Sequence, residues 1–127
     1  MHKLVLIAAG GALGSVLRYA VAGWMQKWTG SAFPIGTLVV NVSGCLVIGF
    51  LGMVLTGPLL IREEYRIALL IGVLGGYTTF STFGRETYLL AADGQFWFAS
   101  MNIFLCNALG LAAVWLGHRV AQKWFGV

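Results

Sequence analysis

The stretch from Gly75 to Glu86, "GGYTTFSTFGRE", places glycines, hydroxyl side chains and charges inside a chain that is otherwise almost continuously hydrophobic. Two adjacent glycines followed by β-branched threonines disfavour a helix in the middle of a hydrophobic segment. Inside a membrane, a break is tolerated only where the freed backbone groups bind an ion, water or a neighbouring segment. The stretch therefore predicts a membrane-spanning helix broken near its middle. Close helix packing is the alternative use of Gly75 and Gly76.

The composition is that of an integral membrane protein. Of 127 residues, 59% are hydrophobic and 9% are charged, and the mean hydropathy is +0.86. Soluble proteins carry roughly 25% charged residues. A hydrocarbon core about 30 Å thick needs about 20 apolar residues per helix. The chain therefore has room for four or five spans and for no separate soluble domain, so residues 1–127 are expected to form one transmembrane domain.

Four hydrophobic segments are separated by short joints that are polar or contain helix breakers. They cover about residues 3–25, 35–55, 66–90 and 96–117. The first begins like a signal peptide, but its apolar character continues past Arg18, which favours a first span. Because backbone amides in lipid need internal partners, such segments must be helices. The expected fold is an all-α membrane bundle of four helices, the third broken near its middle.

The basic residues are scattered singly and form no patch typical of nucleic-acid binding, although the formal net charge is +4. Five lie toward one side of the predicted bundle and three toward the other: Lys3, Arg62, Arg66, Arg119 and Lys123 against Arg18, Lys27 and Arg85. This asymmetry is too weak to fix one orientation. Four short helices also leave little room for a water-lined path within one copy. Both points favour an antiparallel homodimer. The expected location is the plasma (inner) membrane.

Glycine and cysteine positions mainly indicate packing. Two pairs of glycines are spaced four residues apart: Gly10 with Gly14 and Gly72 with Gly76. This spacing lets helix backbones approach closely. Cys45 and Cys106 lie in apolar stretches, where a thiol usually behaves as a small hydrophobe. Neither a disulfide framework nor a metal cluster is indicated, and the absence of nucleophile and base pairs argues against an enzyme.

Several polar residues fall inside the predicted spans, where they are costly and are candidates for function. Thr37 and Asn41 lie four residues apart and share a helix face. The Asn41 amide must donate either to another helix or to a permeating species, and the spacing leaves both uses open. Glu86 lies beside Arg85, and its simplest interpretation is a solvated ion pair at the end of the third helix.

Phe80 and Phe83 lie three residues apart and flank the hydroxyls of Ser81 and Thr82. Phenylalanine in a membrane is usually lipid-facing or core-filling, but its ring edge is positive and attracts an anion without trapping it. Arg18 adds a positive potential near an entrance. Amide, hydroxyl and ring-edge donors together favour a small, hard anion that must be dehydrated stepwise. Carbonyl oxygens at the helix break instead suit a hard cation such as Na⁺.

At this stretch the sequence resembles the Fluc fluoride-channel family, also called CrcB. The resemblance covers nearly the whole chain and rests most specifically on "GGYTTFSTF". Its other motifs are "GGALGSVLRY", "GTLVVNVSGCLVIGF" and "LGLAAVWLG". The resemblance implies a passive, fluoride-selective channel that lowers cytoplasmic fluoride and so confers fluoride resistance. It also implies a dual-topology antiparallel homodimer in the lipid bilayer, with two pores and a structural Na⁺ at its centre.

The resemblance also implies roles for single residues. Those matched to the family's fluoride pore are polar or aromatic: Asn41, Thr37, Phe80, Phe83, Ser81 and Thr82. Arg18 matches the arginine of an electropositive vestibule, and Gly75 and Thr78 match the positions whose carbonyls bind Na⁺. Asn102 and Cys106 stand where members often carry Tyr and then Ser one turn later. Asn102 can still donate to the pore, whereas Cys106 is a poor donor.

Two other functions fit the hydrophobic composition. A small, proton-coupled multidrug-type exporter has four helices and works as an antiparallel dimer. It typically needs a carboxylate in its first helix, and the first span here contains none. A structural or assembly subunit explains the hydrophobicity but not the costly polar cluster between Gly75 and Glu86.

Overall fold

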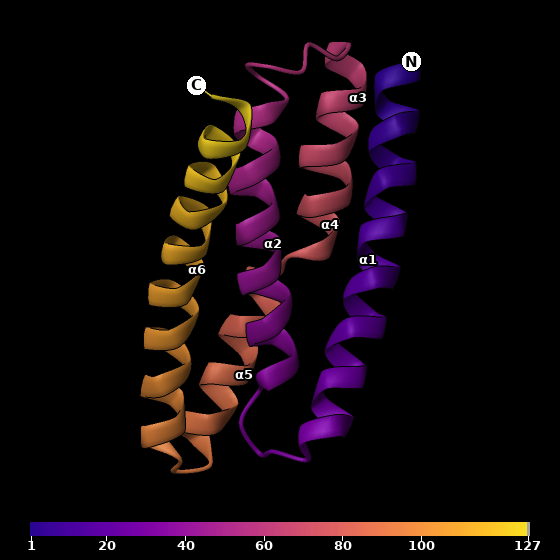
Figure 1. Ribbon diagram of the computed structural model, residues 1–127. Coiled ribbons are helices and arrows are strands. Elements are labelled where there is room, and N and C mark those ends of the chain that lie inside the picture. The colour runs from indigo at the N-terminus through magenta and orange to yellow at the C-terminus, as the bar shows by residue number, and fades with distance from the viewer. Residues whose placement is uncertain (127) are drawn as a thin grey trace.

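The structure is a computed structural model that describes residues 1–126, and its four long apolar helices confirm the expected all-α membrane fold. The helices run up and down beside one another, and both ends of the chain lie at the same end of the bundle (Figure 1). Three spans are single helices: α1 (His2–Thr29), α2 (Ile35–Val54) and α6 (Phe96–Phe125). The third span consists of consecutive pieces: α3 (Glu63–Ile67), the π-helical η1 (Ala68–Val73), α4 (Leu74–Tyr77) and α5 (Phe80–Ala92).

The third span breaks at Thr78 and Thr79, one residue after the two glycines rather than at them. Gly75 and Gly76 remain helical in α4, whereas Thr78 (ψ 157°) and Thr79 (φ −151°, ψ 115°) are extended. Extended backbone is the conformation that β-branched residues favour, and glycine is tolerated inside a membrane helix when neighbours pack on it. The predicted break is therefore confirmed, but the threonines make it. The wide turn of η1 has no counterpart in the prediction.

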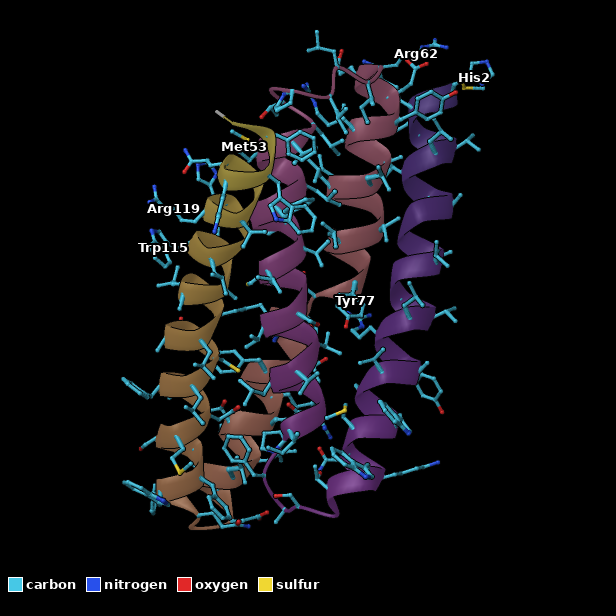
Figure 2. The ribbon with its side chains drawn as sticks, viewed as in Figure 1. His2, Met53, Arg62, Tyr77, Trp115 and Arg119 are labelled. Atoms are coloured by element: carbon cyan, nitrogen blue, oxygen red, sulfur yellow. The ribbon has the colours of Figure 1, made fainter. Side chains whose placement is uncertain are left out.

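The helices extend beyond the predicted spans where the sequence becomes polar. α1 continues from residue 25 to Thr29, and α6 continues from residue 117 to Phe125. α1 ends where Gly30 adopts a left-handed conformation with φ 58°. Figure 2 shows Arg119 pointing outward from this last part of α6. Hydropathy marks the apolar part of a helix, and polar turns can continue it into the interface.

The break lets the third span change neighbours along its length. Its first half, from α3 through α4, packs mainly against α1, whereas α5 packs mainly against α6 (Figure 1). α2 has its most extensive contact with α6. Tyr77, labelled in Figure 2, lies at the end of α4, and its hydroxyl is 2.9 Å from that of Ser43 on α2. The extended segment is thus positioned where all four spans come close.

Glycines make the close contact between α1 and the first half of the third span, which confirms their predicted packing role. The glycines of this contact are those with the four-residue spacing: Gly10, Gly14, Gly72 and Gly76. A Cβ added to Gly10 would lie 2.7 Å from the carbonyl oxygen of Ala68. One added to Gly76 would lie 2.6 Å from that of Gly11. The helices could not approach this closely with larger residues.

Candidate ion site at the broken helix

The side-chain amide of Asn41 on α2 binds the broken backbone through both of its ends. Its Oδ1 accepts a hydrogen bond from Thr79 N at 2.8 Å, and its Nδ2 donates to Thr79 O at 3.0 Å. Thr79 is only 7% exposed, so water cannot readily replace the amide. Asn41 thus supplies the partners that the interrupted helix lacks. The Asn41 amide has two N–H groups. One donates to Thr79 O across the helices, and the other is left for a second ligand.

Thr79 restarts the helix as the N-cap of α5. Its hydroxyl accepts a hydrogen bond from Thr82 N at 3.2 Å and donates to Thr82 Oγ1 at 3.0 Å. The Ser81 hydroxyl lies 3.4 Å from that of Thr79. Thr79 is not among the predicted site residues, although a threonine just before a helix is a usual capping signal. Three hydroxyls therefore gather at the N-terminal, positive end of α5.

The break also releases carbonyl oxygens at the C-terminal end of α4. In an unbroken helix, Gly75 O would accept from Thr79 N and Thr78 O would accept from Thr82 N. Both amides have side-chain acceptors instead. Gly75 faces open space, because a Cβ built there would have no heavy atom within 4 Å apart from its chain neighbours and the adjoining backbone of its own helix. The two carbonyls that the resemblance matches to Na⁺ are thus among those that the break releases.

Arg18 on α1 brings a positive charge to the same place. Its Nη1 donates to Thr78 O at 3.3 Å. A carbonyl oxygen has two lone pairs, so this bond leaves Thr78 O able to accept a second partner. The guanidinium and a bound cation would nevertheless repel each other at this short range.

A first hollow of about 300 Å³ opens between α2, α5 and α6 beside the extended segment. Asn41, Phe80 and Phe83 line it together with Cys45 and Cys106. The two phenylalanine rings are 5.3 Å apart between centroids and tilted by 50°. Phe83 is 8% exposed, whereas Phe80 is 81% exposed. Phe83 therefore belongs to the interior of the bundle, and Phe80 stands at its surface.

A second hollow of about 370 Å³ lies between α1, α2 and the start of α5. It contains the predicted residues Arg18, Thr37 and Thr82, and Thr79 lines it as well as the first hollow. The structure therefore gathers most of the predicted residues in two groups on either side of Thr79, whereas Ser81 and Gly75 line neither hollow. The group in the first hollow consists of two aromatic rings and an amide. The group in the second hollow consists of a guanidinium and hydroxyls.

Glu86 does not form the predicted ion pair with Arg85, although the structure describes both side chains. Its Oε1 accepts a hydrogen bond from Thr37 Oγ1 at 2.8 Å, which engages the Thr37 hydroxyl. Its Oε2 is buried and has no hydrogen-bond partner within residues 1–126. The prediction was wrong because residues adjacent in a helix point in different directions: Arg85 is exposed and Glu86 faces α2.

Asn102 lies apart from both groups. Its side chain is fully buried, and its Nδ2 donates to Thr87 Oγ1 at 2.9 Å across α5 and α6. Its Oδ1 accepts a weak bond from Cys106 Sγ at 3.6 Å. Cys106 and Asn107 line the first hollow, whereas Asn102 is not part of that lining.

Comparison with known proteins gives one consistent result. A family model described as "CrcB-like protein, Camphor Resistance (CrcB)" matches residues 5–118. A "Fluoride-specific ion channel FluC" of Solibacter usitatus (strain Ellin6076) is 46% identical over 95% of this chain and 99% of its own length. The protein of that name in Geobacter metallireducens is 46% identical over 96% of this chain and 98% of its own length. The one in Rhodospirillum rubrum is 47% identical, covering 90% of each.

Proposed function

The chain belongs to the CrcB-like protein family, and from this premise we propose that it is a fluoride channel. Relatives similar over nearly their whole length are named fluoride-specific ion channels, so the chain belongs to a family of channels and is not an enzyme. Its four apolar helices fit a multi-pass protein of the lipid bilayer. The proposed activity is passive, fluoride-selective conduction that lowers cytoplasmic fluoride across the plasma (inner) membrane.

The observation that carries the proposal is the opposite polarity of the two helix ends at the break. α4 ends in carbonyl oxygens, whereas α5 begins with the hydroxyls of Thr79 and Thr82 at its positive end. Half-helices that end inside a membrane use such ends to bind ions of opposite sign. One break therefore offers a site for a cation and a site for an anion within a few residues.

The proposed fluoride ligands are neutral donors and ring edges: Asn41, Phe80, Phe83, Ser81, Thr82, Thr37 and Asn102. Asn41 keeps one N–H group free for an anion after bonding Thr79. Thr37 donates its one hydroxyl proton to Glu86, so it would exchange that bond for a passing ion. Asn102 donates one N–H to Thr87 and, like Asn41, keeps a second N–H. Weak, numerous donors let an anion enter and still leave. Arg18, beside the second hollow, raises the local fluoride concentration electrostatically.

A structural Na⁺ is proposed at the carbonyl oxygens of Gly75 and Thr78. Carbonyls of unwound membrane helices are suitable ligands for this hard cation. The open surface at Gly75 leaves room for a second copy, and two copies would double the number of carbonyl ligands. Because Arg18 donates to Thr78 O, Na⁺ would use the second lone pair of this oxygen and would be repelled by the nearby guanidinium.

The proposed assembly is an antiparallel homodimer with two pores. Phe80 is 81% exposed in one copy although it lines the first hollow. An aromatic ring beside a polar break is better covered by protein than by lipid, because lipid cannot satisfy the backbone groups next to it. A second copy in the opposite orientation would close the hollow, and the weak charge asymmetry of the chain permits both orientations.

Ion efflux from liposomes that contain the purified protein tests the proposal. With valinomycin and K⁺ present to balance charge, the channel predicts rapid release of fluoride and negligible release of chloride. Release of either ion only under a proton gradient would instead support the exporter, for which Glu86, whose Oε2 is buried, is the candidate carboxylate. If neither ion is released, the structural or assembly subunit is the interpretation that remains.

A further inference from the structure

The two cysteines of the chain lie on different helices and face the same space. Cys45 is on α2 and Cys106 is on α6, and both line the first hollow together with Asn41, Phe80 and Phe83. Both are half-buried free thiols, and the chain contains no other cysteine. The hollow thus has two thiols in its wall and no competing thiol elsewhere.

The contacts around Gly110 bring the two thiols to one part of α6. A Cβ built at Gly110 would lie 3.5 Å from Cys45 Sγ, so this sulfur rests against α6. Gly110 follows Cys106 by four residues. Residues with this spacing are neighbours on a helix face, about 5–6 Å apart at Cβ. Cys45 Sγ therefore sits one helical turn from Cys106 on the same side of α6.

The thiols are weakly engaged, and their chemistry selects a narrow class of ligand. Cys106 Sγ donates a weak hydrogen bond to Asn102 Oδ1 at 3.6 Å. A rotation about one side-chain bond would break this hydrogen bond and turn the sulfur toward another ligand. Within residues 1–126 there is no cluster of three or more His, Cys, Asp and Glu, so the tetrahedral ligand set that Zn²⁺ needs is not offered. Two thiolates without further ligands suit a soft d¹⁰ cation that prefers linear coordination.

We infer that Cys45 and Cys106 form a two-thiolate site for a soft monovalent cation, such as Cu⁺ or Ag⁺, and that its occupation closes the fluoride path. Each thiol loses its proton and forms one metal–sulfur bond, so one monovalent cation enters and two protons leave. The product, a cation held by two thiolates, carries a net charge of −1. It stands beside Asn41 and Phe83 in the hollow, where it fills space and repels an anion.

The closing of the path rests on the proposed function, whereas the binding of the cation does not. Binding is therefore measured separately, by calorimetry and proton release when Ag⁺ is added to the purified protein in chloride-free detergent solution. The wild-type chain should bind about one Ag⁺ and release about two protons. The variants Cys45→Ala and Cys106→Ser should each bind Ag⁺ roughly a hundredfold more weakly, because each lacks one of the two ligands.

Flux is then measured in chloride-free liposomes, with each variant's own Ag⁺-free rate as its reference. Stoichiometric Ag⁺ should slow fluoride efflux by about tenfold or more in the wild type, and excess dithiothreitol should restore it. Neither variant should respond. Independent, equal binding to each single-cysteine variant would overturn the site, and undiminished efflux with Ag⁺ bound would overturn the closure. A wild type that releases no fluoride even without Ag⁺ would refute the proposed function, and the calorimetry would still decide the site.

Discussion

Replacing Asn41 with alanine removes the two hydrogen bonds that hold the broken backbone. Thr79 N and Thr79 O lose their partners at 2.8 and 3.0 Å, and Thr79 is 7% exposed, so water compensates poorly. A buried polar group left unpaired costs about 1–3 kcal/mol. Bonds between membrane helices average about 0.6 kcal/mol, because the unfolded chain also finds partners in lipid. For two groups at a site that the fold cannot repair locally, we expect a loss of about 2–4 kcal/mol in the free energy of unfolding.

The loss can be measured by unfolding the protein in mixed micelles with an increasing fraction of sodium dodecyl sulfate. The chain has five tryptophans whose fluorescence reports the transition. Asn107→Ala is the matched control, because Asn107 is exposed and donates to Ile103 O of its own helix at 2.7 Å. The control should stay within about 0.5 kcal/mol of the wild type. An Asn41→Ala protein that is equally stable would refute the conclusion that this amide supports the break.

Other predictions concern packing, the helix cap and the cation. Gly76→Ala should lower the free energy of unfolding by about 1–3 kcal/mol, because its Cβ would meet the backbone of α1 at 2.6 Å. Gly84→Ala should leave the free energy of unfolding unchanged, because the added Cβ would meet no neighbouring segment within 4 Å. Equal losses of stability in the two variants would contradict the packing role of Gly76. Thr79→Val should lower the free energy of unfolding by about 1 kcal/mol, because it removes the side-chain cap of α5. Thr79→Ser keeps a hydroxyl and should retain most of the wild-type stability. Equal stability of the two variants would rule out the cap. Replacing Na⁺ by N-methylglucamine should raise the dissociation constant of the proposed dimer, measured by sedimentation, if the carbonyls of Gly75 and Thr78 bind the cation. An unchanged dissociation constant after this exchange would rule out the proposed structural Na⁺.

The fold was predictable because lipid imposes strong constraints on local sequence. Length and hydropathy are enough to place four helices, and a run of Gly and Thr in the third is enough to place a break near its middle. The position of the break was less predictable. It depends on Asn41, which is 38 residues away from Thr79 in sequence and offers the extended backbone its partners. Contacts of this kind are properties of the packed bundle, and a single sequence does not reveal them.

The candidate site was predictable in its residue types but not in its arrangement. Phe80, Phe83 and Asn41 line one hollow, as a shared role requires. The environment of Glu86 could not be foreseen, because its partner Thr37 lies on another helix while the sequence offered Arg85 next to it. The thiols of the first hollow illustrate the same limit, since apolar flanking residues indicated burial and not a shared space.

The central claim is that fluoride crosses the membrane past the ring edges at the broken helix. Fluoride efflux from liposomes containing Phe80→Ile, compared with Phe96→Ile, tests it most directly. Both phenylalanines are exposed in one copy, at 81% and 68%, but only Phe80 lines the first hollow. Isoleucine keeps the apolar volume and removes the positive ring edge. Efflux should fall by about a hundredfold or more in Phe80→Ile and stay near the wild-type rate in Phe96→Ile, with the dimer intact in both. Undiminished fluoride efflux through Phe80→Ile would contradict the claim.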